Sequence, residues 1–85
     1  RTCLLAMLNA ICQEFCEGVY HLNGRTHVVM EIQYFTALQQ RLLPHGFVCE
    51  SVLRMYERKG FCNATFTKAK SDDLSHPESV FGSSR

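Results

Sequence analysis

Apolar residues near the start of this chain recur at steps of three and four, the spacing that places side chains on one stripe of an α-helix. The stripe consists of Leu4, Leu5, Leu8, Ile11, Cys12, Phe15 and Cys16. The pattern predicts an amphipathic helix over residues 2–17, with Thr2 capping its start and Gly18 closing its end. Because 85 residues support only one hydrophobic core, this helix has to pack into a single domain.

A tight-turn signal follows this helix. Asn23-Gly24 is the dipeptide best suited to a turn in which both central residues have positive φ, and it lies between residues 19–22 and 25–29. The sequence therefore predicts a short β-hairpin. A plain loop between two helices is the alternative, because the first arm has only four residues.

The next segment satisfies two periodicities at once. Val28, Met30, Ile32 and Tyr34 alternate as in a strand, whereas Val28, Ile32, Phe35, Leu38 and Leu42 repeat as in a helix. The strong helix formers of residues 37–43 favour a helix over about 30–43. Pro44-His45-Gly46 is expected to end it.

A third helical pattern covers residues 48–59 and would stop at Gly60. Its apolar side carries Val48, Val52, Met55 and Tyr56, and its other side Glu50, Arg54, Glu57 and Arg58. Residues 61–67 then alternate large and small side chains and include two threonines, which predicts a strand that could pair with the 19–29 region.

Together these elements predict an α+β, helix-dominated domain. It would contain three helices with a short hairpin or strand pair, in an element order like that of winged-helix modules. Residues 1–70 would form a single globular domain and residues 71–85 a flexible polar tail, in which Val80 and Phe81 are the apolar exception. The residues expected to be buried together are Leu8, Ile11, Phe15, Ile32, Leu38, Leu42, Val52 and Met55.

The charge of the chain is small overall but uneven. The net charge is +1, yet residues 51–70 contain five basic residues against Glu57 alone, a local charge of +4. These candidate nucleic-acid-binding residues are Arg54, Arg58, Lys59, Lys68 and Lys70. A stretch of this size falls short of the strongly basic domains typical of nucleic-acid-binding proteins, and it also suits a solvated surface.

Motifs of catalysis and of cofactor binding are absent from the sequence. There is no glycine-rich nucleotide loop, no Walker loop and no nucleophile elbow, and no close pair of histidines or cysteines with the spacing of a structural zinc site. We therefore expect no enzyme, no cofactor and no metal. We also expect no membrane partner, because no apolar run approaches the ~20 residues needed to cross a bilayer.

The five cysteines are relevant to the cellular compartment in which this chain is expected. Their odd number leaves at least one thiol without an internal partner, and Cys12 and Cys16 share the apolar stripe of the first helix. Buried thiols in a reducing compartment are the simplest explanation, so we expect an intracellular protein, nuclear or cytoplasmic. The glycosylation sequon Asn63-Ala64-Thr65 keeps a secreted, disulfide-containing ligand as an alternative.

These observations favour a non-catalytic protein–protein interaction module. Its partner would be another protein or the rest of its own parent chain, since the sequence lacks an initiator Met and is expected to be a fragment of a larger intracellular protein. The alternative is a nucleic-acid-binding module of the winged-helix or helix-turn-helix type, whose five basic residues would contact phosphates.

Overall fold

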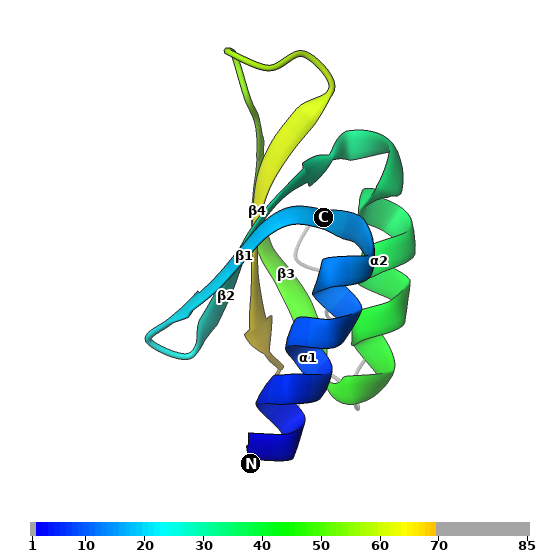
Figure 1. Cartoon of the computed structure of the whole chain (residues 1–85), viewed down its shortest axis with the longest axis vertical. Coiled ribbons are helices and arrows are strands. Elements are labelled where there is room, and N and C mark those ends of the chain that lie inside the picture. Colours follow the sequence, from blue (N-terminus) through cyan, green and yellow to red (C-terminus); the bar gives the residue numbers. More distant parts are fainter. Residues whose placement is uncertain (1, 70–85) are drawn as a thin grey trace, which may run out of the picture.

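The computed structural model describes residues 2–69, with side chains from residue 4 onward. Two helices and four strands follow one another along the chain (Figure 1). They are α1 (Thr2–Phe15), β1 (Cys16–Leu22), β2 (Arg25–Glu31), α2 (Phe35–Leu42), β3 (Phe47–Arg54) and β4 (Phe61–Lys68), with short 3-10 turns η1 (Ile32–Tyr34) and η2 (Leu43–His45) flanking α2. The predicted tail of residues 71–85, with Val80 and Phe81, lies outside the described residues.

The four strands form one antiparallel sheet in the order β1-β2-β4-β3. Both helices lie on the same side of this sheet and pack against each other (Figure 1). In the described part of the chain, no element covers the opposite side, which we call the open face. Residues 2–69 therefore form two layers, and within this range β1 and β3 have no strand on their outer sides.

The prediction of a helix-dominated domain with three helices in winged-helix-like order was wrong. Residues predicted as the third helix form β3 and the turn after it, and β3 pairs with β4 from Phe47 opposite Lys68 to Arg54 opposite Cys62. The apolar spacing of this segment fits either structure. Pairing with β4 satisfies the backbone groups on the inner side of β3 and decides the outcome.

Local signals were more accurate at the turns than at the helix ends. Asn23 and Gly24 have φ of 52° and 75°, which confirms the predicted hairpin turn. Gly18, by contrast, does not close α1, which ends at Phe15, and it lies instead inside β1. The second predicted helix begins late, at Phe35, because Met30 continues the alternation of β2. The predicted strand over 61–67 is confirmed as β4, and it pairs with β2.

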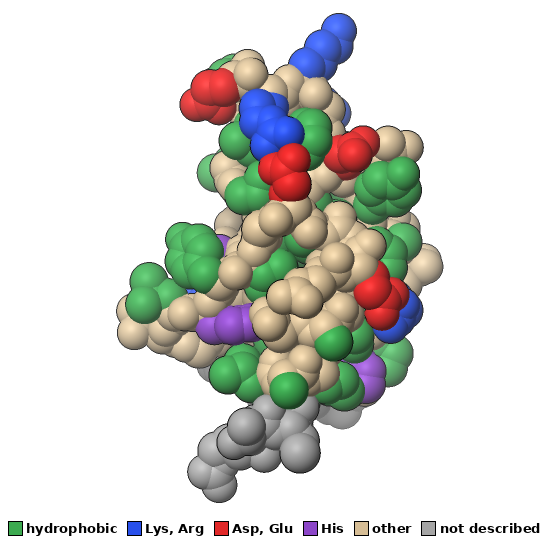
Figure 2. All heavy atoms as spheres, in the orientation of Figure 1, with side chains coloured by type: hydrophobic (Ala, Val, Ile, Leu, Met, Phe, Trp, Pro, Cys, Tyr) green, Lys and Arg blue, Asp and Glu red, His purple; other side chains and the backbone are tan. Residues whose placement is uncertain are grey.

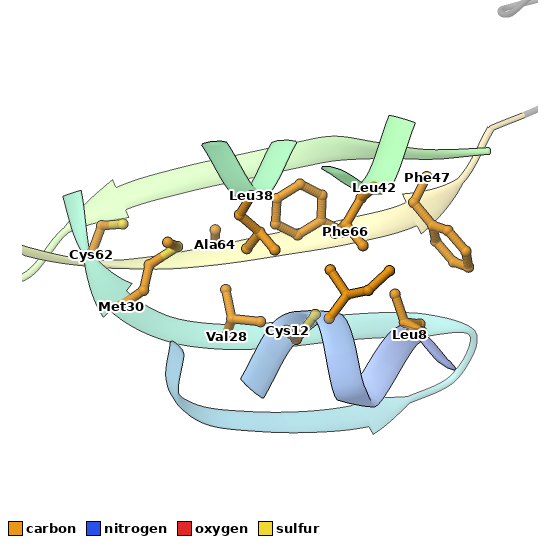
Figure 3. Close-up of a cluster of buried hydrophobic side chains, with 11 residues drawn as sticks. Leu8, Cys12, Val28, Met30, Leu38, Leu42, Phe47, Cys62, Ala64 and Phe66 are labelled. Atoms are coloured by element: carbon orange, nitrogen blue, oxygen red, sulfur yellow. The ribbon is translucent and has the colours of Figure 1, made fainter. Parts of the chain in front are cut away.

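The core lies between the helices and the sheet. Leu8 and Cys12 of α1 and Leu38 and Leu42 of α2 converge on Phe66 of β4, as Figure 3 shows. The buried set also includes Ile11, Val28, Met30, Phe47, Cys62 and Ala64. Four of the eight predicted core residues, Leu8, Ile11, Leu38 and Leu42, are thus confirmed, and Phe15 and Ile32 pack at its margin. Val52 and Met55 were wrongly placed in the core, since Val52 is 45% exposed on β3 and Met55 is only partly buried and lies outside the buried cluster.

Gly46 is the glycine that this fold most requires. It follows η2 with φ of 89°, and its carbonyl accepts a hydrogen bond from the amide of Ala69 (2.6 Å). Because a side chain disfavours this left-handed conformation, Gly46→Ala should lower the free energy of unfolding by about 1 kcal/mol or more in urea titrations. Gly18→Ala is the matched control: its φ is not positive and open space surrounds its Cβ position, so stability should hold or rise. Equal losses in the two variants would contradict the argument.

Candidate functional site

The five predicted nucleic-acid-binding residues do not form one patch. Arg54 ends β3, and Arg58 and Lys59 lie in the turn that leads into β4. Lys68 ends β4, about 24 Å further along the extended strand. Lys70 lies outside the described residues. The structure therefore places three of the residues at one end of the sheet and Lys68 at the other.

Arg58 is also neutralised by a partner that is distant in sequence. Its guanidinium donates to both carboxylate oxygens of Glu17 (2.5 and 2.9 Å) and lies over the ring of Phe61, 3.8 Å from its centre. These hydrogen bonds lower the pKa of Glu17 and raise that of Arg58. Figure 2 shows the same intermixing more widely, with basic side chains lying beside acidic ones rather than gathering into a field.

The open face is arranged in cross-strand rows fixed by the strand register. Directly opposed residues share a face in an antiparallel sheet, so each row runs from β1 through β2 and β4 to β3. The rows are Leu22–Arg25–Thr67–Val48, Tyr20–His27–Thr65–Ser51 and Gly18–Val29–Asn63–Leu53. Arg25 in the first row donates to both carboxylate oxygens of Glu50 (2.8 and 3.2 Å), so the basic residue of this row is paired with an acidic one.

Two stacked rings stand in the middle row. The rings of Tyr20 and His27 lie 4.7 Å apart with 20° between their planes, and Nδ1 of His27 shares a hydrogen bond with the Thr65 hydroxyl (3.2 Å). The hydrogen bond fixes the imidazole, and the imidazole supports one face of the Tyr20 ring. Since β1 is the outer strand, the other face of that ring is turned toward the free edge. Tyr20 is accordingly 59% exposed.

A hollow of ≈ 320 Å³ lies beside these rings. Gly18, Val29 and Asn63 contribute to its lining together with Tyr20 and His27. The hollow exists because Gly18 has no side chain, and no atom lies within 4 Å of the position that its Cβ would take. It is therefore a gap in an otherwise regular row of side chains.

The part of the β1 edge next to this hollow, from Gly18 to Leu22, is unprotected. From Gly18 to Leu22 the strand pairs with β2 without interruption, and it carries neither a charged residue nor proline. Natural proteins shield free edges with charges, prolines or bulges, because the unpaired backbone groups otherwise attract another strand. β1 has such devices only at its start, where Glu17 lies at a bulge between Cys16 and Gly18. The other edge, β3, has them along its length: a bulge between Cys49 and Ser51 and the charged residues Glu50 and Arg54.

A second hollow, of ≈ 440 Å³, lies between the start of α1 and the β1–β2 turn. Leu5 and Leu22 are half exposed there, beside Lys68. This hollow is the larger of the two, but the described chain ends next to it at Ala69. We base no function on it.

The described cysteines differ in the direction of their pKa shifts: a hydrogen bond with Cys16 lowers the pKa of Cys12, whose side chain is fully buried. Cys12, Cys16, Cys49 and Cys62 are free thiols that lie between the sheet and the helices or at the margin of that layer. Burial raises the pKa of Cys49 and Cys62, and the neighbouring Cys12 thiol raises that of Cys16, so these three are protonated at neutral pH. No cluster of three or more potential metal ligands occurs among residues 2–69.

Sequence reasoning missed the Gly18 hollow, because Gly18 was interpreted as the end of a helix. The uncharged run from Gly18 to Leu22 before the Asn23-Gly24 turn could have indicated an unprotected strand, but not that this strand is an edge. Neither helix of the described part is long and apolar enough to span a bilayer. Comparison with protein-family models, with curated proteins and with solved structures gave no match to this chain.

Proposed function

We propose that this domain is a non-catalytic protein-interaction module that binds another polypeptide at β1 and the adjoining open face. The observation that carries the proposal is the uncharged free edge from Gly18 to Leu22 beside the hollow at Gly18. The nucleic-acid and secreted alternatives, like the nuclear or cytoplasmic location, stay predictions, because no observation on the described residues favours them.

The edge and the hollow would contribute different parts of the binding energy. The backbone groups on the outer side of β1 can pair with an extended segment, which gives affinity without much sequence preference. The hollow can accept one side chain from that segment, which gives selectivity. The residues that line the hollow include no carboxylate, lysine or arginine, so a charged side chain would lose its hydration there without an ion-pair partner in the lining. The favoured side chain is therefore apolar or aromatic.

Selection of peptides on the immobilised chain tests this proposal. A phage-displayed library of random linear peptides is the probe, and we expect enriched peptides to combine β-branched residues with an aromatic residue. Tyr20→Lys should weaken their binding at least tenfold, because it removes the stacked ring and puts a charge on the edge. Leu43→Lys is the matched control, since Leu43 is 49% exposed on η2, on the helical side.

The two variants separate the possible results. Loss of binding in Tyr20→Lys with retention in Leu43→Lys supports the site. Equal binding of the selected peptides by both variants would show that they attach elsewhere and would contradict the proposal, as would a library in which nothing is enriched from a monomeric chain.

A further inference from the structure

We propose that the polypeptide bound at β1 is a second copy of this chain, related by a two-fold axis at Val19, so that Tyr20 of each copy covers Gly18 of the other. This inference rests on the proposed function and names its partner. The two four-stranded sheets would then join into one continuous sheet through their β1 edges.

The register follows from the faces of β1. Gly18 and Tyr20 lie on the open face, opposite Val29 and His27, whereas Val19 lies on the helical face, opposite Val28. An axis perpendicular to the sheet keeps the open faces of both copies on the same side. Antiparallel pairing then requires a residue to oppose its own copy, and an axis at Val19 sets Gly18 opposite the second copy's Tyr20.

The side chains that meet in this register are complementary. Gly18 leaves a hollow of ≈ 320 Å³, and Tyr20 has an unsupported ring face turned toward the free edge. An aromatic ring that lies over a glycine in a neighbouring strand covers the exposed backbone and restores packing that the glycine lacks. Because of the two-fold symmetry, this contact occurs twice in the dimer. The Val19 residues of the two copies face each other between these two contacts.

Charges do not oppose this pairing. The run from Gly18 to Leu22 is uncharged, and the next residue outward, Glu17, would lie opposite the second copy's His21. Directly opposed like charges, which destabilise strand pairs, are therefore avoided. Glu17 lies at a bulge in β1, between Cys16 and Gly18, and β3 likewise has a bulge at Glu50. β1 is favoured over β3 because β3 contains no glycine over which an aromatic ring could lie.

Sedimentation equilibrium from micromolar to millimolar concentration tests the inference. The wild-type chain should show a monomer–dimer equilibrium, and Tyr20→Lys should raise its dissociation constant at least tenfold. Leu53→Lys is the matched control, because Leu53 is also a large apolar residue on the open face, 68% exposed, but on the β3 edge. Tyr20→Thr, which removes the ring while keeping a residue suited to strands, replaces Tyr20→Lys if the latter fails to fold.

A mixed sample of isotope-labelled and unlabelled chains tests the register itself. We expect intermolecular nuclear Overhauser effects between the Tyr20 ring and the Gly18 α-protons. A dimer that Leu53→Lys dissociates and Tyr20→Lys does not would overturn the inference. So would a chain that stays monomeric throughout; if that monomer still binds selected peptides in a Tyr20-dependent way, the proposed function survives without its second-copy partner.

Discussion

Replacing Phe66 with alanine is expected to lower the free energy of unfolding by about 3–5 kcal/mol. Phe66 is fully buried on β4 and lies beside Leu38 and Leu42 of α2 (Figure 3). Its ring also lies 6.0 Å from the centre of the Phe35 ring. The substitution removes the largest fully buried side chain of the described residues and leaves a cavity that surrounding groups fill only in part. Urea denaturation followed by circular dichroism measures the loss.

Phe61→Ala is the matched control for this prediction. Phe61 lies on the same strand but is only partly buried, and its ring contacts the guanidinium of Arg58. Its truncation removes less buried area and opens no enclosed cavity, so the loss should be well below that of Phe66→Ala. Equal losses in the two variants would mean that the open face is covered in solution.

Truncating Leu8 to alanine should cost about 2–5 kcal/mol. Leu8 is 3% exposed, and it packs in the same buried cluster as residues of the sheet and of α2. Because the amphipathic α1 gains its stability from burying this stripe, weakening the contact should loosen the whole helix rather than one side chain. Thermal unfolding monitored at the helical circular-dichroism band gives the measurement.

Leu5→Ala provides the comparison within the same helix. Leu5 is 50% exposed, so its removal should change stability much less than that of Leu8. A near-neutral result for Leu8→Ala, or a larger loss for Leu5→Ala, would show that α1 turns a different face to the sheet.

The sequence predicted best those elements whose signals are local. The stripe of α1 and the Asn23-Gly24 turn depend on residues that are neighbours along the chain, and both were identified. β3 was mistaken for a helix because the spacing of Val48 and Val52 fits both the strand period of two and the helix period of about 3.6. No neighbouring residue in the sequence distinguishes the two structures. Its partner, β4, begins after the intervening turn, and the cross-strand pairing that decides the outcome is a property of the folded sheet.

The candidate site was not predictable for a related reason. Whether β1 is an edge depends on the strand order, which places β4 rather than β3 beside β2. The basic stretch was misinterpreted for the same reason. Arg58 counts toward a basic patch in the sequence, but in the fold it pairs with Glu17, which lies in β1 at the far edge of the sheet from β3. Exposure of Val52 likewise follows from its place on the outer strand β3.

The strand order also shapes the route by which the chain reaches its native state. β1–β2 and β3–β4 are hairpins whose ends meet across short turns, whereas the central pair brings Thr26 opposite Phe66, with α2 and β3 in between. Closing so long a loop costs more entropy than closing either hairpin. Non-local pairing of this kind is what slows folding in small domains. We therefore expect the pairing of β2 with β4 to limit the folding rate, so substitutions along this pair should slow folding more than substitutions within either hairpin.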